Sequence, residues 1–358
     1  MAGTIRIGSI GIGGIANGVH IPGILASKDL ELKAICDNNP AALEAAQKKY
    51  GIDSRYCFTD YNDLINCPEV DAIDITTPND VHFPIALAAA KSGKPFSLEK
   101  PITLTSEQAD ILADTVKKYG NKNMVCFSYR FKSASRYARD LVRQGVIGDV
   151  RHIYGQFLQG WGDMGFGGKP APLMWRFIKE RTGTGALGDL GSHILDLASF
   201  VSGKNILKIM AHGDTIVKER PLPDGSGMGT VDVDDFCHML AMMEDHVSAT
   251  FEVSRFAYGR DHQRLEIYGT KGALIYTNHG LYGCKLEACV GAPYTNAQQM
   301  NELVIPAQYK ADQMQAFADL INGNPSEMTA SIIDGMINQH VLTAAEKSFE
   351  SGEWVEVK

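Results

Sequence analysis

Hydrophobic and polar positions divide the chain into two stretches of different character. Over about the first 125 residues, short apolar runs typical of buried strands alternate with segments in which apolar positions recur with helical spacing. The predicted strands are residues 5–10, 30–36, a short strand near 56, 70–76, 95–98 and 123–128. The predicted helices are residues 14–26, 40–50, 61–66, 81–92 and 106–119. Strands that alternate with helices in this way predict a parallel, doubly wound α/β sheet.

The pattern changes after Tyr129. We expect a helix over 133–144, a long strand over 150–159, a loop rich in Gly and Pro over 160–172, and a helix over 185–201. Strands are then predicted at 209–217, 232–243, 247–255, 264–268 and 272–277, and closing helices at 308–322 and 330–349. The chain therefore divides into an α/β domain over 1–128 and an α+β domain over 129–358, the latter with a large, mostly antiparallel open sheet.

Local signals add detail within the first domain. The helix over 14–26 is expected to be irregular around Pro22, because proline interrupts helical hydrogen bonding. Pro40 suits the first turn of the helix over 40–50, and Ser106 is a plausible cap for the helix over 106–119.

Composition and charge exclude several kinds of partner. The net charge is −8, which argues against nucleic acid or an anionic membrane as a partner, because both require a strongly basic surface. The seven cysteines are scattered without metal-binding spacing, so we expect reduced thiols in a cytoplasmic protein. No apolar segment is long enough to predict a membrane span or a secretion signal.

A glycine-rich turn, Gly11-Ile-Gly13-Gly-Ile-Ala16, follows the first predicted strand. Its first glycine permits the tight turn, its second lets a pyrophosphate approach, and the small Ala16 allows close packing of the next helix. Asp37 follows the second strand, about 20 residues further on, where a carboxylate suits the ribose diol of NAD and repels the extra phosphate of NADP. The pattern predicts NAD binding. The alternative is a glycine turn for another ligand, with Asp37 as a helix cap.

Three more motifs occur in order along the chain. Thr77-Pro-Asn79-Asp-Val-His82 follows the fourth predicted strand, Glu99-Lys100-Pro101 the fifth, and Gly188-Asp189-Leu-Gly-Ser-His193 opens a helix of the second domain. With the glycine turn, these motifs resemble the Gfo/Idh/MocA family of glucose–fructose oxidoreductase and inositol dehydrogenase over nearly the whole chain. The resemblance implies a Rossmann domain, a domain with an open sheet, and an active site between them. It also implies metal-free redox chemistry on a sugar or cyclic polyol, and pairing of the open sheets into homodimers or homotetramers.

Three residues are expected to carry the chemistry. Lys100 lies at the carboxyl end of a predicted strand, where its charge would polarise an alcohol. Asp189 and His193 are four residues apart, so a helix places both on one face, and histidine suits a general base. The alternatives are a solvated lysine, a capping aspartate and a buried histidine. The resemblance implies His193 as base, Asp189 as substrate ligand, Lys100 as assisting group, and a cis bond before Pro101. Which of Lys100 and His193 accepts the proton first stays open.

Further residues are expected around the cofactor and the substrate. The predicted cofactor set is Gly11, Ile12, Gly13, Gly14, Ile15, Asp37, Thr77, Asn79, His82, Glu99, Lys100, Trp175 and Arg176. The predicted substrate set is Lys100, Gln159, Arg176, Asp189 and His193. Residues 159–163 and 173–177 resemble a branch that includes levoglucosan and scyllo-inositol dehydrogenases.

Several of these residues could have a purely structural role instead. The rings of Trp161 and Trp175 could stack on a sugar or simply anchor a loop. His82 could be a packing residue at a helix start, and Arg130 is favoured slightly as a structural rather than a substrate-binding residue. Asp232, Asp234 and Asp235 suggest a metal cluster, but neighbours on a strand point to opposite faces, so a solvated strand start is favoured and no metal is expected.

These observations together favour an NAD-dependent dehydrogenase that acts on a secondary alcohol of a cyclic polyol or sugar. Two other hypotheses remain open. The same fold could use bound NAD for transient oxidation during glycoside hydrolysis or epimerisation, or the chain could be a non-catalytic sensor of NAD or a sugar.

Overall fold

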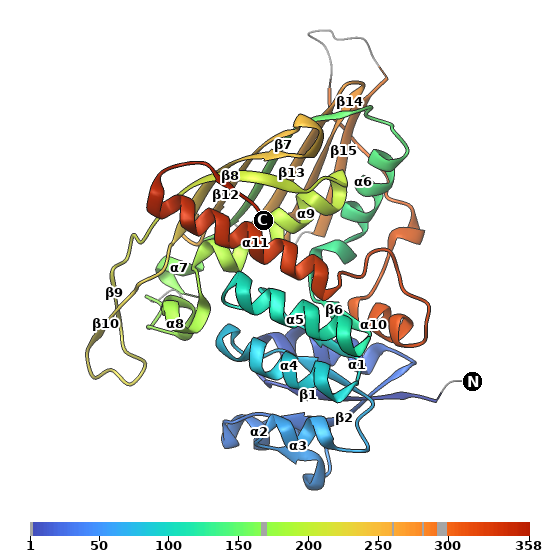
Figure 1. Cartoon of the computed structure of the whole chain (residues 1–358), viewed down its shortest axis with the longest axis vertical. Helices are drawn as coiled ribbons and strands as arrows, with labels where there is room; N and C mark the ends of the chain where they lie inside the picture. Colours follow the sequence, from blue (N-terminus) through green and yellow to red (C-terminus); the bar gives the residue numbers. More distant parts are fainter. Residues whose placement is uncertain (1–2, 166–169, 260, 281–282, 292–298) are drawn as a thin grey trace. The chain divides into compact units, whose positions relative to one another are not determined.

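The computed structural model describes residues 3–165, 170–259, 261–280, 283–291 and 299–358 (Figure 1). The chain forms two compact units. The first comprises Met1–Ser128 with Ala311–Ile337, and the second comprises Tyr129–Lys310 with Asn338–Lys358. Within the described part of the chain, no helix has the length and apolar character needed to cross a membrane.

Six parallel strands form the sheet of the first unit, in the order β3-β2-β1-β4-β5-β6. They are β1 (Ile5–Ile10), β2 (Leu30–Cys36), β3 (Cys57–Phe58), β4 (Ala72–Ile75), β5 (Phe96–Leu98) and β6 (Asn123–Val125). Every neighbouring pair is parallel, which confirms the predicted doubly wound sheet. The strand order reverses between β1 and β4, and sheets of this kind bind ligands at the carboxyl ends of the strands beside that reversal.

Helices connect the strands of the first unit. They are a π-helical turn (Ala16–His20) that continues into α1 (Ile21–Ala26), followed by α2 (Pro40–Tyr50), α3 (Tyr61–Asn66), α4 (His82–Ser92) and α5 (Ser106–Tyr119). Pro40 occupies the first turn of α2, as predicted, behind the capping residue Asn39. The cap of α5 is Thr105 rather than Ser106. Thr105 has an extended backbone, and its side chain accepts a hydrogen bond from the amide of Gln108.

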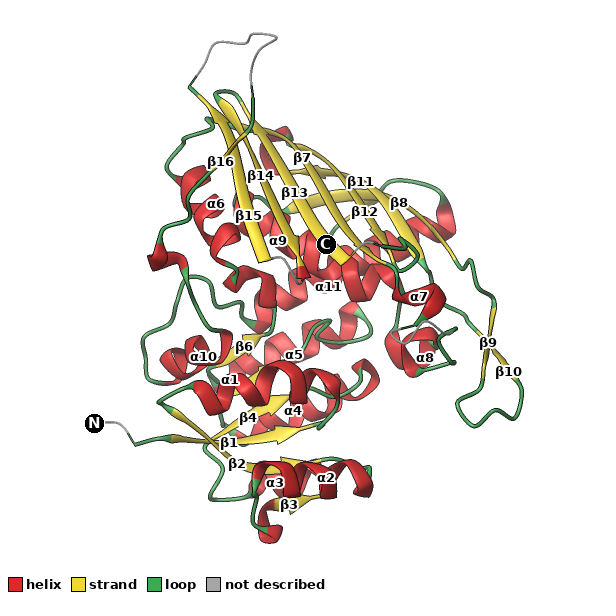
Figure 2. Ribbon diagram, turned by 180° about the vertical axis from the view of Figure 1, so that it is seen from behind, coloured by secondary structure: helices red, strands yellow, loops and turns green. Residues whose placement is uncertain are grey.

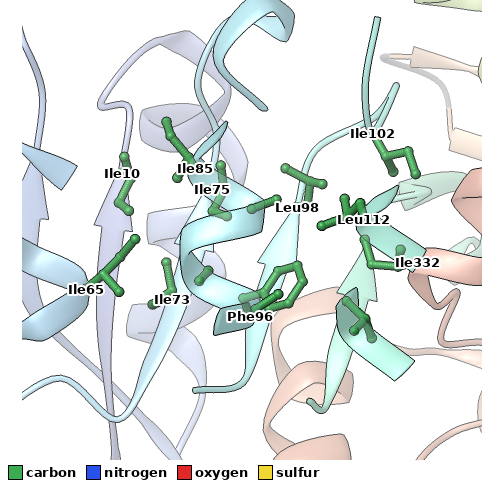
Figure 3. Close-up of a cluster of buried hydrophobic side chains, with 14 of the residues drawn as sticks. Ile10, Ile65, Ile73, Ile75, Ile85, Phe96, Leu98, Ile102, Leu112 and Ile332 are labelled. Atoms are coloured by element: carbon green, nitrogen blue, oxygen red, sulfur yellow. The ribbon is translucent and has the colours of Figure 1, made fainter. Parts of the chain in front are cut away.

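A cluster of buried side chains packs α3, α4 and α5 against the sheet (Figure 3). Its members include Ile10, Ile73, Ile75, Ile85, Phe96, Leu98, Ile102, Leu112 and Ile332, all 2% exposed or less. Full burial of one such side chain contributes about 2–3 kcal/mol. Because this cluster fixes the strands, it also fixes the residues that follow their carboxyl ends, where the predicted cofactor site lies.

Residues 311–337 pack with the first unit, whereas we predicted them in the second domain. This segment includes α10 (Gln313–Ile321) and the start of α11 (Ile332–Ser351), which runs on into the second unit. Ser27 donates a hydrogen bond to Gln315 at 2.8 Å, and Val125 at the end of β6 forms a bridge with Ala330. We predicted the segment in the second domain because it follows that domain in sequence. Its apolar side chains are instead buried against the first unit.

In the described part of the second unit, nine strands form one sheet, in the order β16-β15-β14-β13-β7-β12-β11-β8-β17. They are β7 (Val150–Gln159), β8 (Ile206–Asp214), β11 (Phe236–Met243), β12 (Ser248–Ser254), β13 (Asp261–Gly269), β14 (Gly272–His279), β15 (Gly283–Val290), β16 (Asn301–Glu302) and β17 (Val355–Glu356). A separate hairpin joins β9 (Glu219–Pro221) to β10 (Met228–Thr230). The pair β7–β12 is parallel and the other described pairs of this sheet are antiparallel, which confirms the predicted class.

The helices of the second unit cover one face of this sheet. They are α6 (Ser133–Arg143), α9 (Ser192–Ser202) and the later part of α11, with short helices α7 (Trp161–Met164) and α8 (Lys179–Thr182) in the connections. Figures 1 and 2, which view the unit from opposite sides, show α6, α9 and α11 on the same side of the strands. The opposite face carries alternate residues such as Leu240 and Tyr268, which are 48% and 38% exposed.

The acidic segment before β11 differs from its prediction. Residues 232–235 precede the strand, and Asp234 and Asp235 are buried rather than solvated. Asp234 accepts hydrogen bonds from the amides of Gly185 and Leu187, whereas Asp235 accepts from those of Ile216 and Val217. The two carboxylates therefore bind different segments of backbone. We expected them to point apart because neighbours on a strand face opposite ways, but they point apart because each binds its own pair of amides.

Candidate functional site

The glycine turn follows β1 directly. Gly11 has a φ of +88° and donates a hydrogen bond to the carbonyl of Cys36 at the end of β2. A Cβ at this position would lie 2.8 Å from the main-chain nitrogen and Cα of Thr77. Both the backbone conformation and the close approach therefore require glycine here.

The next residues of the turn present an open surface. A Cβ added at Gly13 or Gly14 would meet no atom within 4 Å. Beside the turn, the hydroxyl of Thr77 is buried and has no hydrogen-bond partner among the described residues. An open glycine backbone at a helix start, with a neighbouring hydroxyl in need of a partner, fits the pyrophosphate of a dinucleotide.

Asp37 extends this surface from the end of β2. Its Oδ2 accepts the amide of Ile12 at 2.8 Å and its Oδ1 accepts the amide of Asn39 at 2.8 Å. Each carboxylate oxygen has a second lone pair, so the anchored group can still accept hydrogen bonds from a ribose diol. Of the neighbouring predicted residues, Ile12 is buried and Ile15 is 39% exposed.

His82, in the motif after β4, links two loops at the edge of the sheet. The ring nitrogens of His82 face the carbonyl oxygens of Pro101 and Thr77, at 2.8 and 2.9 Å. Burial lowers the pKa of His82, a residue that is 1% exposed. This geometry favours the packing alternative over cofactor contact, because His82 ties two loops of the sheet edge together. Asn79 lies beside it and is also buried.

The motif after β5 places Lys100 at the same edge. Lys100 is partly exposed, and the bond to Pro101 is cis, as the resemblance implied. Glu99 is also partly buried, with its side chain 12% exposed. Its Oε1 contacts a ring nitrogen of His20 at 2.9 Å, and its Oε2 accepts the amide of Lys100 at 3.2 Å.

Sequence reasoning missed His20, which ends the π-helical turn behind the glycine motif. Its side chain is fully buried between Asp74 and Glu99, 2.8 and 2.9 Å from their carboxylate oxygens. Burial alone would lower the pKa of His20, but these two carboxylates outweigh it and raise the pKa to about 10. The available signal was a histidine within an otherwise apolar run, but its partners lie 54 and 79 residues away in sequence.

The second unit holds Asp189 and His193, at a π-helical turn (Leu187–Gly191) that leads into α9. Asp234 fixes the start of this segment through the amides of Gly185 and Leu187. Burial raises the pKa of Asp234, opposed by those amides and by Arg255. The wider π turn means that the four-residue spacing of Asp189 and His193 does not follow ordinary α-helical geometry.

Neighbouring side chains contact both Asp189 and His193. Arg255, fully buried, donates to the carbonyl of Gly185 at 2.9 Å and to Asp189 Oδ2 at 3.4 Å. The His193 ring lies edge-on to Tyr129, with ring centroids 4.7 Å apart. The arrangement leaves the side chain of Asp189 21% exposed.

The tryptophan segments differ from each other. Trp161 is buried, and its indole nitrogen donates to Gln159, whose amide nitrogen in turn donates to Asp261. These contacts favour the loop-anchor interpretation of Trp161, and Gln159 stays a predicted substrate ligand. Trp175 is partly exposed and stacks with the guanidinium of Arg176, 4.3 Å from its ring centroid.

Arg130 lies inside the second unit. Its guanidinium makes a bidentate contact with Asp196, and both side chains are nearly buried. This geometry favours the structural role over substrate binding, because the guanidinium of Arg130 is already directed at a carboxylate.

The seven cysteines are all free.

Comparison with known proteins assigns both halves of the chain to one family. Residues 5–127 match the family described as oxidoreductase family, NAD-binding Rossmann fold, and residues 135–275 match the GFO/IDH/MocA C-terminal domain. A levoglucosan dehydrogenase of Pseudarthrobacter phenanthrenivorans is 32% identical over 257 residues, which cover 68% of this chain and 64% of that protein.

Solved structures agree over the full length. An oxidoreductase domain protein from Kribbella flavida has a TM-score of 0.89 at 31% identity, with all of both chains covered. A levoglucosan dehydrogenase in complex with NADH has a TM-score of 0.88 at 27% identity, with 99% of both chains covered. The glycine turn, Asp37 and the doubly wound sheet agree with these findings, and the chain belongs to the GFO/IDH/MocA family of oxidoreductases, with an NAD-binding Rossmann fold as its first domain.

Proposed function

We propose that this protein is an NAD-dependent dehydrogenase that transfers a hydride between a secondary alcohol of a cyclic polyol or sugar and nicotinamide. The observation that carries the proposal is the position of Lys100. It follows β5, next to β4, at the same sheet edge as the glycine turn and Asp37. The name of the levoglucosan dehydrogenase relative supports a sugar or polyol as the substrate class.

Each of the three residues has a distinct role in this proposal. The ammonium of Lys100 polarises the substrate oxygen and stabilises its developing negative charge. His193 accepts the hydroxyl proton, and Asp189, held by Arg255, binds a neighbouring hydroxyl. NAD, when bound, accepts the hydride. We further propose that Trp175 and Arg176 contact the cofactor or the substrate from their exposed stack.

A panel of alcohols with NAD and then NADP tests the activity. We expect NADH absorbance to appear with at least one of levoglucosan, the inositol isomers or common sugars, and to be slower with NADP. If the enzyme holds NAD tightly and converts a substrate without net formation of NADH, transient oxidation would be favoured instead. No turnover across the panel, with NADH still bound, would favour a sensor and contradict the proposal.

Paired variants test the residues. Lys100→Met and His193→Asn should each lower kcat about 100-fold or more while NADH binding, followed by fluorescence, stays nearly unchanged. Lys91→Met and His246→Asn are matched controls, because both side chains are exposed and outside the proposed site. Near-normal turnover in Lys100→Met or His193→Asn would remove that residue from the mechanism.

We also propose that the uncovered face of the nine-stranded sheet pairs two copies of the chain into a homodimer. Across this face, His238, Glu252, Gln156 and Arg264 lie side by side in register, and exposed Leu240 lies beside this row. Leu240→Lys should lower the molar mass measured by light scattering. Ile111→Lys, a matched change at an exposed position of α5, should leave it unchanged. An unchanged mass in Leu240→Lys, or a monomeric wild type, would contradict the proposal.

A further inference from the structure

A buried chain of polar groups runs beneath the carboxyl edge of the first sheet. Asp74, on β4, accepts hydrogen bonds from the hydroxyls of Ser97 at 2.8 Å and Ser9 at 3.3 Å. Its Oδ1 also faces Nδ1 of His20 at 2.8 Å, and Nε2 of the same ring faces Glu99 at 2.9 Å. The side chains of His20 and Asp74 are both 0% exposed. Groups so deeply buried are retained only where each satisfies another.

With Asp74 and Glu99 both ionised, the geometry favours His20 as an imidazolium. Both ring nitrogens face carboxylate oxygens, and an ionised carboxylate can only accept a hydrogen bond. A neutral ring would direct one nitrogen lone pair at an anion. The pKa of His20 agrees with this assignment: burial lowers it, the carboxylates of Asp74 and Glu99 raise it, and their balance brings it to about 10. One buried cation therefore joins the buried carboxylate of Asp74 to the partly buried carboxylate of Glu99.

A metal ion is the alternative occupant of this cluster. Cys126, which follows β6, brings its sulfur within 4.8 Å of the ligand atoms of His20 and Glu99. A thiol must lose its proton to bind a metal, and burial raises the pKa of Cys126 well above its usual value. Both ring nitrogens of His20 are already directed at carboxylates. The contacts therefore favour a proton shared among the side chains over a metal.

The chain of contacts ends at the backbone of Lys100. Glu99 uses one carboxylate oxygen for His20 and the other for the amide of Lys100, at 3.2 Å. His20 thus holds the carboxylate of Glu99 in place, and this carboxylate in turn holds the backbone nitrogen of Lys100. If His20 were neutral or absent, Glu99 would lie beside Asp74 without a cation, and like charges at this depth repel strongly.

We propose that His20 is a positioning residue, whose contact with Glu99 holds the backbone of Lys100 at the edge of the sheet. The proposal rests on the proposed function of Lys100 in hydride transfer. His20 does not touch substrate or cofactor in this account. Its effect is to keep the Lys100 ammonium in line with the reacting alcohol, and displacement of a catalytic group by about 1 Å can cost about 100-fold in rate.

Kinetics of His20→Asn test the proposal. Asn removes the cation but keeps a polar group of smaller size. We expect kcat with the best alcohol of the panel to fall about 10- to 100-fold, with the dissociation constant of NADH within about threefold of wild type. Hydride transfer should become more rate-limiting, so the primary isotope effect, measured with the same alcohol deuterated at its carbinol carbons, should increase. A mere loss of folded protein lowers kcat without changing the isotope effect.

A matched variant separates positioning from general disturbance of the core. Asp74→Asn changes the other partner of the same ring but leaves the contact between His20 and Glu99, so it should keep kcat within about threefold of wild type. If His20→Asn fails to fold, the double variant His20→Asn/Asp74→Asn removes one anion together with the cation and takes its place. It should show the same loss of kcat and the same larger isotope effect.

The outcomes distinguish this inference from the proposed function. Normal kcat in the His20 variants, with Lys100→Met inactive, would overturn the positioning role and leave the function intact. Normal kcat in Lys100→Met would overturn the function itself. A lowered kcat with an unchanged isotope effect would reduce His20 to a folding role. A stoichiometric metal in the wild type that Cys126→Ala loses would replace the proton by a metal site.

Discussion

Raising the pH should destabilise the first unit through His20. The groups that face this ring are Asp74 from β4, Glu99 after β5 and the thiol of Cys126 after β6. In the folded unit burial and the two carboxylates set the pKa of His20 at about 10, whereas an unfolded histidine has a pKa of about 6.5. The folded state thus holds its proton more tightly, so the stabilisation is complete below about pH 6.5 and is lost as the pH rises through about 10.

The size of the effect follows from these two values. The full difference corresponds to about 5 kcal/mol, at about 1.4 kcal/mol for each pH unit between the two pKa values. Between about pH 7 and about pH 9, His20 should therefore remove about 2 to 3 kcal/mol from the free energy of unfolding of the first unit. This loss is a large fraction of the stability of a typical domain.

Two buried cysteines report the units separately. Cys126 lies in the first unit and Cys237 in the second, and both are 0% exposed. A short maleimide pulse at increasing urea concentrations, followed by mass spectrometry, gives the unfolding midpoint at each cysteine. From about pH 7 to about pH 9, the free energy at Cys126 should fall by about 2 to 3 kcal/mol more in the wild type than in His20→Asn/Asp74→Asn. Cys237 should respond alike in both proteins.

The comparison with the double variant cancels the contributions of the other titrating groups to the pH dependence, because both proteins contain the same thiols. An equal pH dependence at Cys126 in the two proteins would refute the reasoning. The ring can also be observed directly, since carbon-13-labelled histidine gives an NMR signal that His20→Asn would lack. A His20 signal that titrates near pH 6.5 would show that the buried carboxylates do not hold the proton.

Three further predictions concern the predicted cofactor site and the predicted substrate site. Asp37→Ser should lower the preference for NAD over NADP about tenfold or more in kcat/KM, because the carboxylate no longer repels the extra phosphate; an unchanged ratio would contradict its role. Gly11→Ala should abolish NADH binding in a fluorescence titration and lower Tm, since its Cβ would lie 2.8 Å from the backbone of Thr77; normal binding would show that the turn can widen. Arg255→Lys should raise the KM for the alcohol severalfold without changing NADH binding, because the contact to Asp189 is lost; an unchanged KM would exclude Arg255 from orienting Asp189.

The sequence predicted most of the first unit because its signals are local. Alternation of apolar runs with amphipathic segments located the strands of the parallel sheet, and Pro40 and the glycine turn fixed two element starts. The strand β15 was missed, although Cys284, Leu286 and Ala288 alternate with polar residues along it. A short pattern of small side chains is a weak signal, and the neighbouring strand β14 supplies the pairing that stabilises it.

Long-range packing explains the other differences. Residues 311–337 carry no local sign of the unit they join, since contacts such as Ser27 with Gln315 link positions 288 residues apart. Asp234 and Asp235 read as solvated because acidic residues usually are, but each finds two backbone amides in a distant segment. Such partners become visible only when the chain is folded.

The candidate site shows the same division between local and distant signals. Lys100, Asp189 and His193 were predicted because each belongs to a compact motif at the end of a strand or the start of a helix. His20 stands among apolar residues, in the run Val19-His-Ile-Pro-Gly-Ile24, where a helical pattern predicts a core position. A core histidine still requires partners for both ring nitrogens, and strands β4 and β5 each supply one acid near their carboxyl ends, Asp74 and Glu99. A polar residue at an apolar position is therefore a reason to search neighbouring strands for its partner, and here that partner leads to Lys100.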